Sequence, residues 1–184
     1  MTYWLHVCDC RLIFDAVSIA VRPSDAELYQ LALETGQILR RRGMRLVTAE
    51  SCTGGWVGMV MTAVPGSSAW YDRGFITYSN DAKHAQLGVA MATIAEAGAV
   101  SIATVREMAA GALQHSVADI AVSISGIAGP GGGTPQKPVG MVCIGWLMRD
   151  GTALETVCHL EGNRDGIRAC AVAAALRGVI ALLE

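Results

Sequence analysis

A serine in a glycine-rich turn is the first residue of the chain whose setting suits catalysis. Ser51 lies in the segment E-S-C-T-G-G at 50–55, between an apolar run at 45–49 and a helical pattern at 56–64. Glycines let backbone N–H groups turn toward a ligand, and a helix start favours developing negative charge. The pattern indicates a serine nucleophile with backbone donors for an oxyanion. A plain helix N-cap is the structural alternative, and Cys52 is a rival nucleophile.

A serine nucleophile needs a base, and the sequence favours a lysine. None of the four histidines stands in a recognisable triad setting: His6, His84, His115 and His159. The chain has only two lysines, Lys83 and Lys137. Lys83 follows Tyr78 at the end of an expected strand, so burial there would lower its pKa and suit it as a base, with Tyr78 assisting. A solvated lysine at a helix start is the alternative.

Two further segments have the composition of anion-binding sites. The loop at 126–138 is rich in glycine and proline, and its backbone N–H groups, with Thr134 and Lys137, would suit a phosphate. Arg164 and Arg168 open the last helix, where cations oppose the helix dipole unless an anion is near. The structural alternatives are a ligand-free crossover loop and surface ion pairs.

Composition excludes several classes of protein. The net charge of −2 provides no excess of cations for a protein devoted to nucleic acid, and 52% hydrophobic with 16% charged residues excludes disorder. The apolar run at 169–183 is short for a membrane span and contains Arg177, and charged residues interrupt the first 21 residues, unlike a signal peptide. We therefore expect a cytoplasmic protein that binds neither nucleic acid nor membrane.

The elements that must position these residues alternate in type. A capping box at Ser24–Glu27 starts a helix that Gly43 can end, so we place the domain at 23–184 and treat 1–22 as a poorly ordered N-terminal extension. Cys8 and Cys10 in that extension are incidental thiols or half of a metal site, and the chain offers no second ligand pair. Further helices are expected at 56–64, 79–87, 101–116 and 164–183, and strands at 45–49, 71–78, 119–125, 139–148 and 153–160.

Alternation of helices and strands predicts an α/β fold, a three-layer α/β/α sandwich. Asp150-Gly151 between the last two strands is a tight-hairpin signal. The sheet must therefore contain an antiparallel pair and be mixed. We also expect a homodimer or higher homo-oligomer, since small Ala/Gly-rich α/β domains commonly associate.

Five blocks of sequence resemble one known family. They are T-A-E-S-C-T-G-G-W at 48–56, G-S-S-A-W at 66–70, G-F-I-T-Y-S-N-D-A-K at 74–83, S-G-I-A-G-P-G-G-G-T-P-Q-K-P-V-G at 125–140 and G-N-R-D-G-I-R at 162–168. In this order they resemble the CinA C-terminal domain family, whose stand-alone members are nicotinamide-nucleotide amidases. Larger members carry an additional N-terminal pyrophosphatase-like domain, for which 22 leader residues are too few, so we expect the stand-alone type.

The resemblance implies a reaction and roles for residues. It implies hydrolysis of nicotinamide mononucleotide (NMN) to nicotinic acid mononucleotide and ammonia, without metal or organic cofactor. Ser51, Lys83 and Tyr78 would be catalytic, through a Ser/Lys acyl-enzyme mechanism that the tyrosine assists. From the motifs and charge we expect the substrate to be held by Glu50, Cys52, Thr53, Gly54, Gly55, Asn80, Ser125, Gly126, Gly129, Gly131, Gly132, Thr134, Lys137, Arg164 and Arg168.

Two other functions remain open at this point. One is a non-catalytic nucleotide-binding or regulatory module linked to competence or DNA damage, which would need neither Ser51 nor Lys83. The other is redox sensing through Cys52, which would need an exposed low-pKa thiol and a resolving partner.

Overall fold

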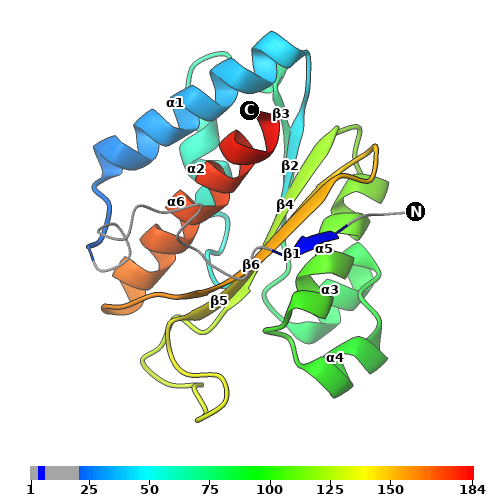
Figure 1. Cartoon of the computed structure of the whole chain (residues 1–184), viewed down its shortest axis with the longest axis vertical. Coiled ribbons are helices and arrows are strands. Elements are labelled where there is room, and N and C mark those ends of the chain that lie inside the picture. Colours follow the sequence, from blue (N-terminus) through cyan, green and yellow to red (C-terminus); the bar gives the residue numbers. More distant parts are fainter. Residues whose placement is uncertain (1–3, 7–20) are drawn as a thin grey trace.

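A six-stranded mixed sheet forms the centre of the protein. The structure, a computed structural model, describes residues 4–6 and 21–184. The strand order is β1-β6-β5-β4-β2-β3, and helices cover both faces of the sheet (Figure 1). The predicted α/β sandwich with a mixed sheet is therefore confirmed.

The strands divide into a parallel part and an antiparallel part. Strands β2, β3 and β4 run parallel, whereas β5 is antiparallel to both β4 and β6, and β1 runs parallel to β6. The hairpin predicted from Asp-Gly is the β5–β6 pair. The strands are β1 (Trp4–His6), β2 (Leu46–Glu50), β3 (Tyr71–Ile76), β4 (Ile120–Gly126), β5 (Met141–Met148) and β6 (Ala153–His159).

The helices form two outer layers. Helices α1, α2 and α6 contact one another on one face, and α5 contacts α3 and α4 on the other. The helices are α1 (Asp25–Arg42), α2 (Trp56–Thr62), α3 (Asn80–Leu87), α4 (Met91–Ala97), α5 (Ile102–Gln114) and α6 (Arg164–Leu183), with a 3₁₀ turn, η2, at Ser67–Ala69.

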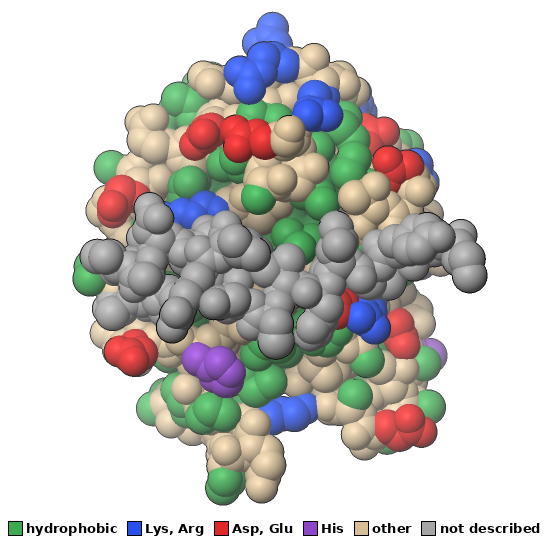
Figure 2. Space-filling view, viewed as in Figure 1, with side chains coloured by type: hydrophobic (Ala, Val, Ile, Leu, Met, Phe, Trp, Pro, Cys, Tyr) green, Lys and Arg blue, Asp and Glu red, His purple; other side chains and the backbone are tan. Residues whose placement is uncertain are grey.

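The helix boundaries follow the capping residues in the sequence. Ser24 and Glu27 form the predicted capping box at the start of α1, and Gly43 ends that helix at φ 65°. Three arginines, 40 to 42, lie in its last turn, where cations are favoured by the helix dipole. Basic side chains gather at the top of Figure 2, and elsewhere on that face acidic and basic side chains are interspersed.

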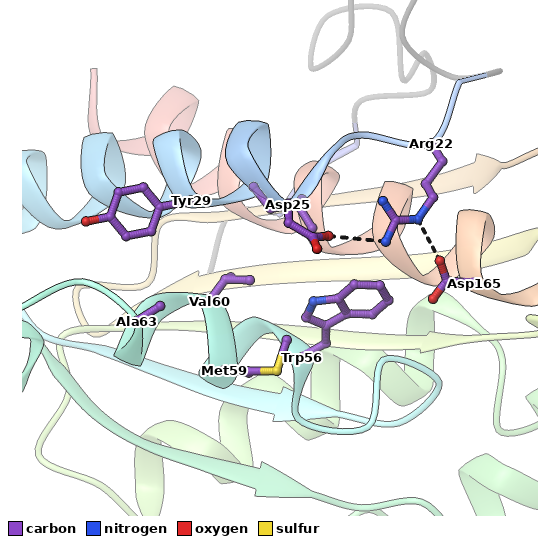
Figure 3. Close-up of a pocket in the computed structure, with 9 residues that line it drawn as sticks. Arg22, Asp25, Tyr29, Trp56, Met59, Val60, Ala63 and Asp165 are labelled. Carbon is purple, nitrogen blue, oxygen red and sulfur yellow. Dashed lines mark hydrogen bonds and ion pairs between the residues drawn. The ribbon is translucent and has the colours of Figure 1, made fainter.

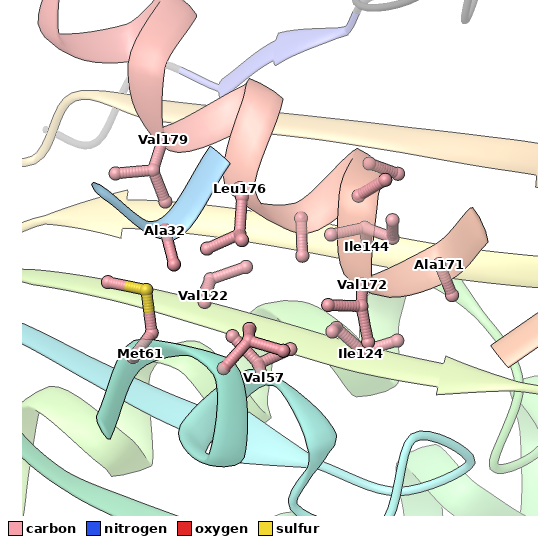
Figure 4. Packing of buried hydrophobic residues seen from close by; sticks show 14 of the residues in the cluster. Ala32, Val57, Met61, Val122, Ile124, Ile144, Ala171, Val172, Leu176 and Val179 are labelled. Carbon is pink, nitrogen blue, oxygen red and sulfur yellow. The ribbon is translucent and has the colours of Figure 1, made fainter. Parts of the chain in front are cut away.

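Small side chains let α6 approach the sheet closely. Apolar side chains of α6 pack with those of α1, α2 and the central strands (Figure 4). By length and composition alone, α6 is the one helix among residues 4–6 and 21–184 that would suffice to cross a membrane, and 72% of its most apolar window is buried in the protein. It is therefore the core helix of this domain.

Three elements were not predicted. Strand β1 pairs residues 4–6 with β6, although the sequence predicts only an extension there, and the sequence predicts neither α4 nor η2. Isolated three-residue elements carry no periodic signal, and Ala90, the residue before α4, provides no side-chain cap. Cys8 and Cys10, and most of the predicted extension, lie outside the described residues.

Parallel β2, β3 and β4 end at the same edge of the sheet. Ser51 follows β2, Thr77 follows β3, and Ser125 and Gly126 are the last residues of β4. The β2–β4 and β2–β3 registers bring Glu50 opposite Ile124 and Ile76. This edge therefore gathers chain segments that are far apart in the sequence, as is usual for ligand sites of α/β sheets.

Close packing of α6 generates a stability prediction. A Cβ at Gly178 would lie 2.1 Å from Trp146 Cζ2, and Trp146 donates to the Ala175 carbonyl at 2.9 Å. Gly178→Ala should lower the free energy of unfolding by about 1–3 kcal/mol, although alanine is the better helix former by about 1 kcal/mol. The measurement is urea unfolding of both proteins.

Gly166→Ala is the matched control in the same helix. A Cβ there would meet nothing closer than Asn163 Oδ1 at 3.5 Å, so we expect stability to be equal or higher. A Gly178→Ala protein as stable as the wild type would contradict this account of the packing.

Candidate active site

Backbone hydrogen bonds from both neighbouring strands hold Ser51 at the end of β2. Ser51 N donates to the Ile124 carbonyl at 3.0 Å, and Thr77 N donates to the Glu50 carbonyl at 2.8 Å. The Ser51 side chain is 8% exposed. The hydroxyl therefore stands at a fixed point of the sheet edge.

The buried amine of Lys83 contacts the Ser51 hydroxyl. Ser79 caps α3, which carries Lys83 back toward β2. Lys83 Nζ donates to Ser51 Oγ and to the Thr77 carbonyl, both at 2.9 Å. Lys83 is only 1% exposed, and burial lowers the pKa of its amine. The lysine that we expected to act as base thus has both the contact and the environment that this role requires.

Cys52 is the weaker candidate for the nucleophile. Its side chain belongs to the apolar core on the α6 side of the sheet. Burial raises the pKa of the Cys52 thiol to about 12, although the neighbouring amides of Cys52 and Thr53 favour the thiolate. A buried thiol that stays protonated is a poor nucleophile and a poor redox sensor.

The turn between Ser51 and α2 is held from inside by a carboxylate. Gly54 and Gly55 have φ of 63° and 90°, which a residue with a Cβ adopts only with strain. Glu50 accepts from Gly55 N, Val57 N and Gly58 N at 3.0–3.1 Å. The first amides of α2 are therefore occupied, and the helix start that we expected to favour an anion is not open to one.

Two amides of the turn bond to no oxygen of the described chain, and both face the Cys52 sulfur. Gly54 N donates to the Ser51 carbonyl at 3.0 Å, and Trp56 N donates to the Thr53 carbonyl at 3.3 Å. Across residues 4–6 and 21–184, no oxygen accepts a hydrogen bond from the amides of Cys52 or Thr53. These are the two residues directly after Ser51, where oxyanion donors are needed.

A cavity of about 260 Å³ opens onto the Ser51–Lys83 pair. It brings together eight of the predicted site residues and three apolar ones. Its lining residues are Ser51, Cys52, Tyr78, Asn80, Lys83, Ala99, Val100, Ser125, Gly126, Ala128 and Arg164.

Tyr78 and Arg164 form one wall of this cavity. Arg164 donates to Tyr78 Oη at 2.9 Å and to the Gly129 carbonyl at 2.7 Å. Tyr78 is 61% exposed, and within the described chain its hydroxyl bonds to Arg164 rather than to Ser51 or Lys83. The predicted tyrosine thus lies at the site, in contact with a cation.

The glycine-rich loop lies mostly outside the cavity. Gly131, Gly132 and Thr134 are exposed, and Thr134 Oγ1 accepts from Lys137 N within a local turn. Lys137 Nζ donates to the carbonyls of Ala97 and Val100. Lys137 therefore holds the 97–100 segment, of which Ala99 and Val100 line the cavity.

Most of the remaining predicted residues belong to the 51–55 turn or bond to it, whereas Gly129 accepts from Arg164. Arg168 Nε donates to the Cys52 carbonyl at 3.1 Å and Nη2 to the Thr53 carbonyl at 2.8 Å. Like Glu50, Thr53, Gly54, Gly55 and Gly129, it does not line the cavity. Thr53 Oγ1 is buried without a hydrogen-bond partner among the residues described.

Sequence reasoning missed three lining residues and one carbonyl. Ala99, Val100 and Ala128 line the cavity, and the Thr77 carbonyl accepts from Lys83. Nothing in the sequence distinguishes small apolar residues, or backbone carbonyls, that line a site from those elsewhere in the chain. The hydrogen bond from Ser125 Oγ to the Ala99 carbonyl, 2.7 Å long, positions part of this wall.

A second cavity, of about 310 Å³, lies between α1 and α2 (Figure 3). Its charged groups pair with one another: Arg22 donates to Asp165 at 2.6 Å and to Asp25 at 3.2 Å. Trp56, Met59 and Val60 supply an apolar wall. It contains no pair of nucleophile and base.

Among the described side chains, the histidines and the acidic residues form no alternative centre. His84 Nδ1 lies 2.9 Å from the Val89 carbonyl, and His115 Nδ1 lies 2.9 Å from the Gly111 carbonyl. Within the described ranges, no three His, Cys, Asp or Glu side chains are grouped so that they could hold a metal ion. The Ser51–Lys83 cavity is therefore the candidate active site.

The environment of Cys52 predicts its reactivity. With a pKa of about 12, Cys52 should react with iodoacetamide at pH 8 on the order of a thousandfold more slowly than an ordinary thiol. Peptide mapping by mass spectrometry after timed alkylation measures this rate, and alkylation in denaturant is the control. Labelling of Cys52 in the folded protein at the rate of a free thiol would refute this assignment.

Comparison with known proteins places the chain in a family. Residues 28–183 match the sequence model of the CinA C-terminal domain. The curated protein "Nicotinamide-nucleotide amidohydrolase PncC" of Escherichia coli (strain K12) is 51% identical over 154 residues, covering 84% of this chain and 93% of that protein. The protein of the same name from Pseudomonas putida is 45% identical, covering 83% of this chain and 94% of that one.

Solved structures agree with the sequence match. The crystal structure of competence/damage inducible protein CihA from Agrobacterium tumefaciens matches with a TM-score of 0.85 at 43% identity, covering 90% of this chain and 99% of that one. A CinA superfamily protein from Escherichia coli matches with a TM-score of 0.82 at 32% identity, covering 90% and 95%. The chain belongs to the CinA C-terminal domain family.

Proposed function

We propose that this protein hydrolyses the carboxamide of NMN, giving nicotinic acid mononucleotide and ammonia. The observation that carries the proposal is the buried Lys83 amine, 2.9 Å from Ser51 Oγ, at the base of a cavity. The names of the relatives from Escherichia coli and Pseudomonas putida supply the substrate class. A pair of this kind is suited to acyl transfer.

In the first half of the reaction, Ser51 Oγ attacks the carboxamide carbon. Neutral Lys83 accepts the hydroxyl proton as the C–O bond forms. The amides of Cys52 and Thr53 are the donors left to stabilise the carboxamide oxygen as it becomes negative. Lys83 then returns the proton to the leaving nitrogen, the C–N bond breaks and ammonia departs.

In the second half, water hydrolyses the acyl ester on Ser51. Lys83 is again the base: it takes a proton from the water and returns it to Ser51 Oγ as the ester bond breaks. Thr77 holds the amine through its carbonyl throughout, so the lysine needs no reorientation between the two halves. The product is nicotinic acid mononucleotide.

The polar groups of the cavity wall are the candidates for holding the nucleotide. Asn80, Ser125 and Arg164 line the cavity together with Tyr78. Arg164 carries the fixed positive charge among them and already bridges Tyr78 to the Gly129 carbonyl. We assign the phosphate to Arg164 because it lines the cavity, which Lys137 and Arg168 do not.

The proposal predicts the effects of removing either member of the pair. Ser51→Ala and Lys83→Met should each lower the rate of ammonia release from NMN by at least about 100-fold, since each removes a reacting group. Stopped-time ammonia assays measure the loss, and thermal melts show whether the variants are folded.

Ser68→Ala, an exposed serine in η2, is the matched control and should keep full activity. Ammonia release by Ser51→Ala at the wild-type rate would exclude Ser51 as the nucleophile. Loss of activity in Cys52→Ala with retention in Ser51→Ala would transfer that role to Cys52.

The lowered pKa of Lys83 predicts how activity depends on pH. The base must be neutral, so kcat/KM should rise with pH and level off above the pKa of Lys83 in the free enzyme. Because burial lowers that pKa, the midpoint should lie below the pKa of an ordinary lysine. A rate that falls across this range would show that the charged amine is the active form.

A further inference from the structure

We infer that Glu50 and Arg168 are positioning residues that together hold the 51–55 turn in the shape in which the Cys52 and Thr53 amides, which bond to no oxygen of the described residues, can serve the oxyanion. The inference rests on the proposed function and adds the residues that set its geometry. It assigns to both side chains a role other than contact with substrate.

Most backbone amides in and next to the 51–55 turn already donate to an oxygen of the protein. Glu50 takes the amides of Gly55, Val57 and Gly58, and the Ser51 carbonyl takes the amide of Gly54. Ser51 N is already used by β4. An amide that already donates to a protein oxygen cannot also donate to a ligand. The amides of Cys52 and Thr53 are the two in the turn that have no oxygen acceptor among the described residues.

Arg168 binds two backbone carbonyls of the turn. Its guanidinium reaches from α6 and donates to the carbonyls of Cys52 and Thr53 through two different nitrogens. Because a peptide unit is planar, fixing the Cys52 carbonyl also fixes the orientation of the Thr53 N–H. Arg168 is itself held by Trp56, with its Cζ 5.1 Å from the ring centroid.

The buried side chain of Glu50 lies in a network of hydrogen bonds. Glu50 is 1% exposed, and Thr48 Oγ1 donates to Glu50 Oε1 at 3.3 Å while lying 2.9 Å from Tyr71 Oη. Space for this network depends on glycine, since a Cβ at Gly58 or Gly74 would lie 2.7 Å from Tyr71 Oη. Glu50 does not line the cavity, so it acts through the turn amides that it accepts from.

Two substitutions test the inference, one in β2 and one in α6. Glu50→Gln replaces one acceptor oxygen by an NH₂ group that cannot accept from the turn amides. Arg168→Lys keeps the positive charge but has no planar fork to reach both carbonyls. We expect each to lower kcat for NMN at least about tenfold, with KM changed less than about threefold, since the loss falls on the transition state.

Glu34→Gln on the exposed face of α1 is the matched control and should leave kcat and KM unchanged. The midpoint of the pH profile should also stay in place in both variants, because neither removes a contact of Lys83. Thermal melts identify a variant that fails to fold. If Glu50→Gln does not fold, Arg168→Lys decides the question.

Unchanged kcat in folded Glu50→Gln and Arg168→Lys would overturn the inference. A raised KM with unchanged kcat in Arg168→Lys would also overturn it, because Arg168 would then hold the substrate. These outcomes differ from failure of the proposed function, in which the wild type releases no ammonia or Ser51→Ala remains active.

Discussion

The burial of one amine determines the chemistry that the site can perform. An ordinary lysine is charged at neutral pH and cannot accept a proton, whereas Lys83 is 1% exposed and its pKa is lowered by burial. Its hydrogen bonds to Ser51 and to the Thr77 carbonyl compensate part of the cost of removing it from water. The position of Ser51 at the end of β2 and the capping of α3 by Ser79 set this contact.

Sheet topology supplies the convergence that the contact needs. Parallel β2, β3 and β4 end at one edge, so residues 51, 77 and 125 meet although they are far apart in the chain. The helices on both faces complete the site: α3 returns Lys83 to the edge, and α6 brings Arg164 to the cavity and Arg168 to the turn. Backbone hydrogen bonds fix the strands, and caps fix the starts of the helices. The site residues that these elements carry are therefore in position before any ligand binds.

The sequence was informative about elements with caps and periodicity, and less so about contacts. Ser24 caps α1 where we expected it, and Ser101 and Asn163 cap the helices that we expected at 101–116 and 164–183. Residue type and family resemblance also identified Ser51, Lys83 and Tyr78, which the structure places around one cavity. Whether they act as expected stays a prediction.

The roles of Glu50, Lys137 and Arg168 were beyond sequence reasoning for a physical reason. In the sequence, a charged residue in a polar segment looks the same whether its side chain binds a ligand or a backbone group of the protein. The choice depends on which carbonyl or amide the fold places within about 3 Å. Likewise, Ala99 and Val100 line the cavity through their position after α4, a short helix that lacks a side-chain cap.

The central claim is that Ser51 carries the acyl group, and rapid-quench mass spectrometry tests it most directly. Enzyme mixed with NMN and quenched in acid within the first turnover would be digested and its peptides mapped. The account predicts a nicotinoyl mononucleotide ester on Ser51, absent from Lys83→Met. An adduct on Cys52, or complete turnover with Ser51 unmodified at every time point, would contradict it.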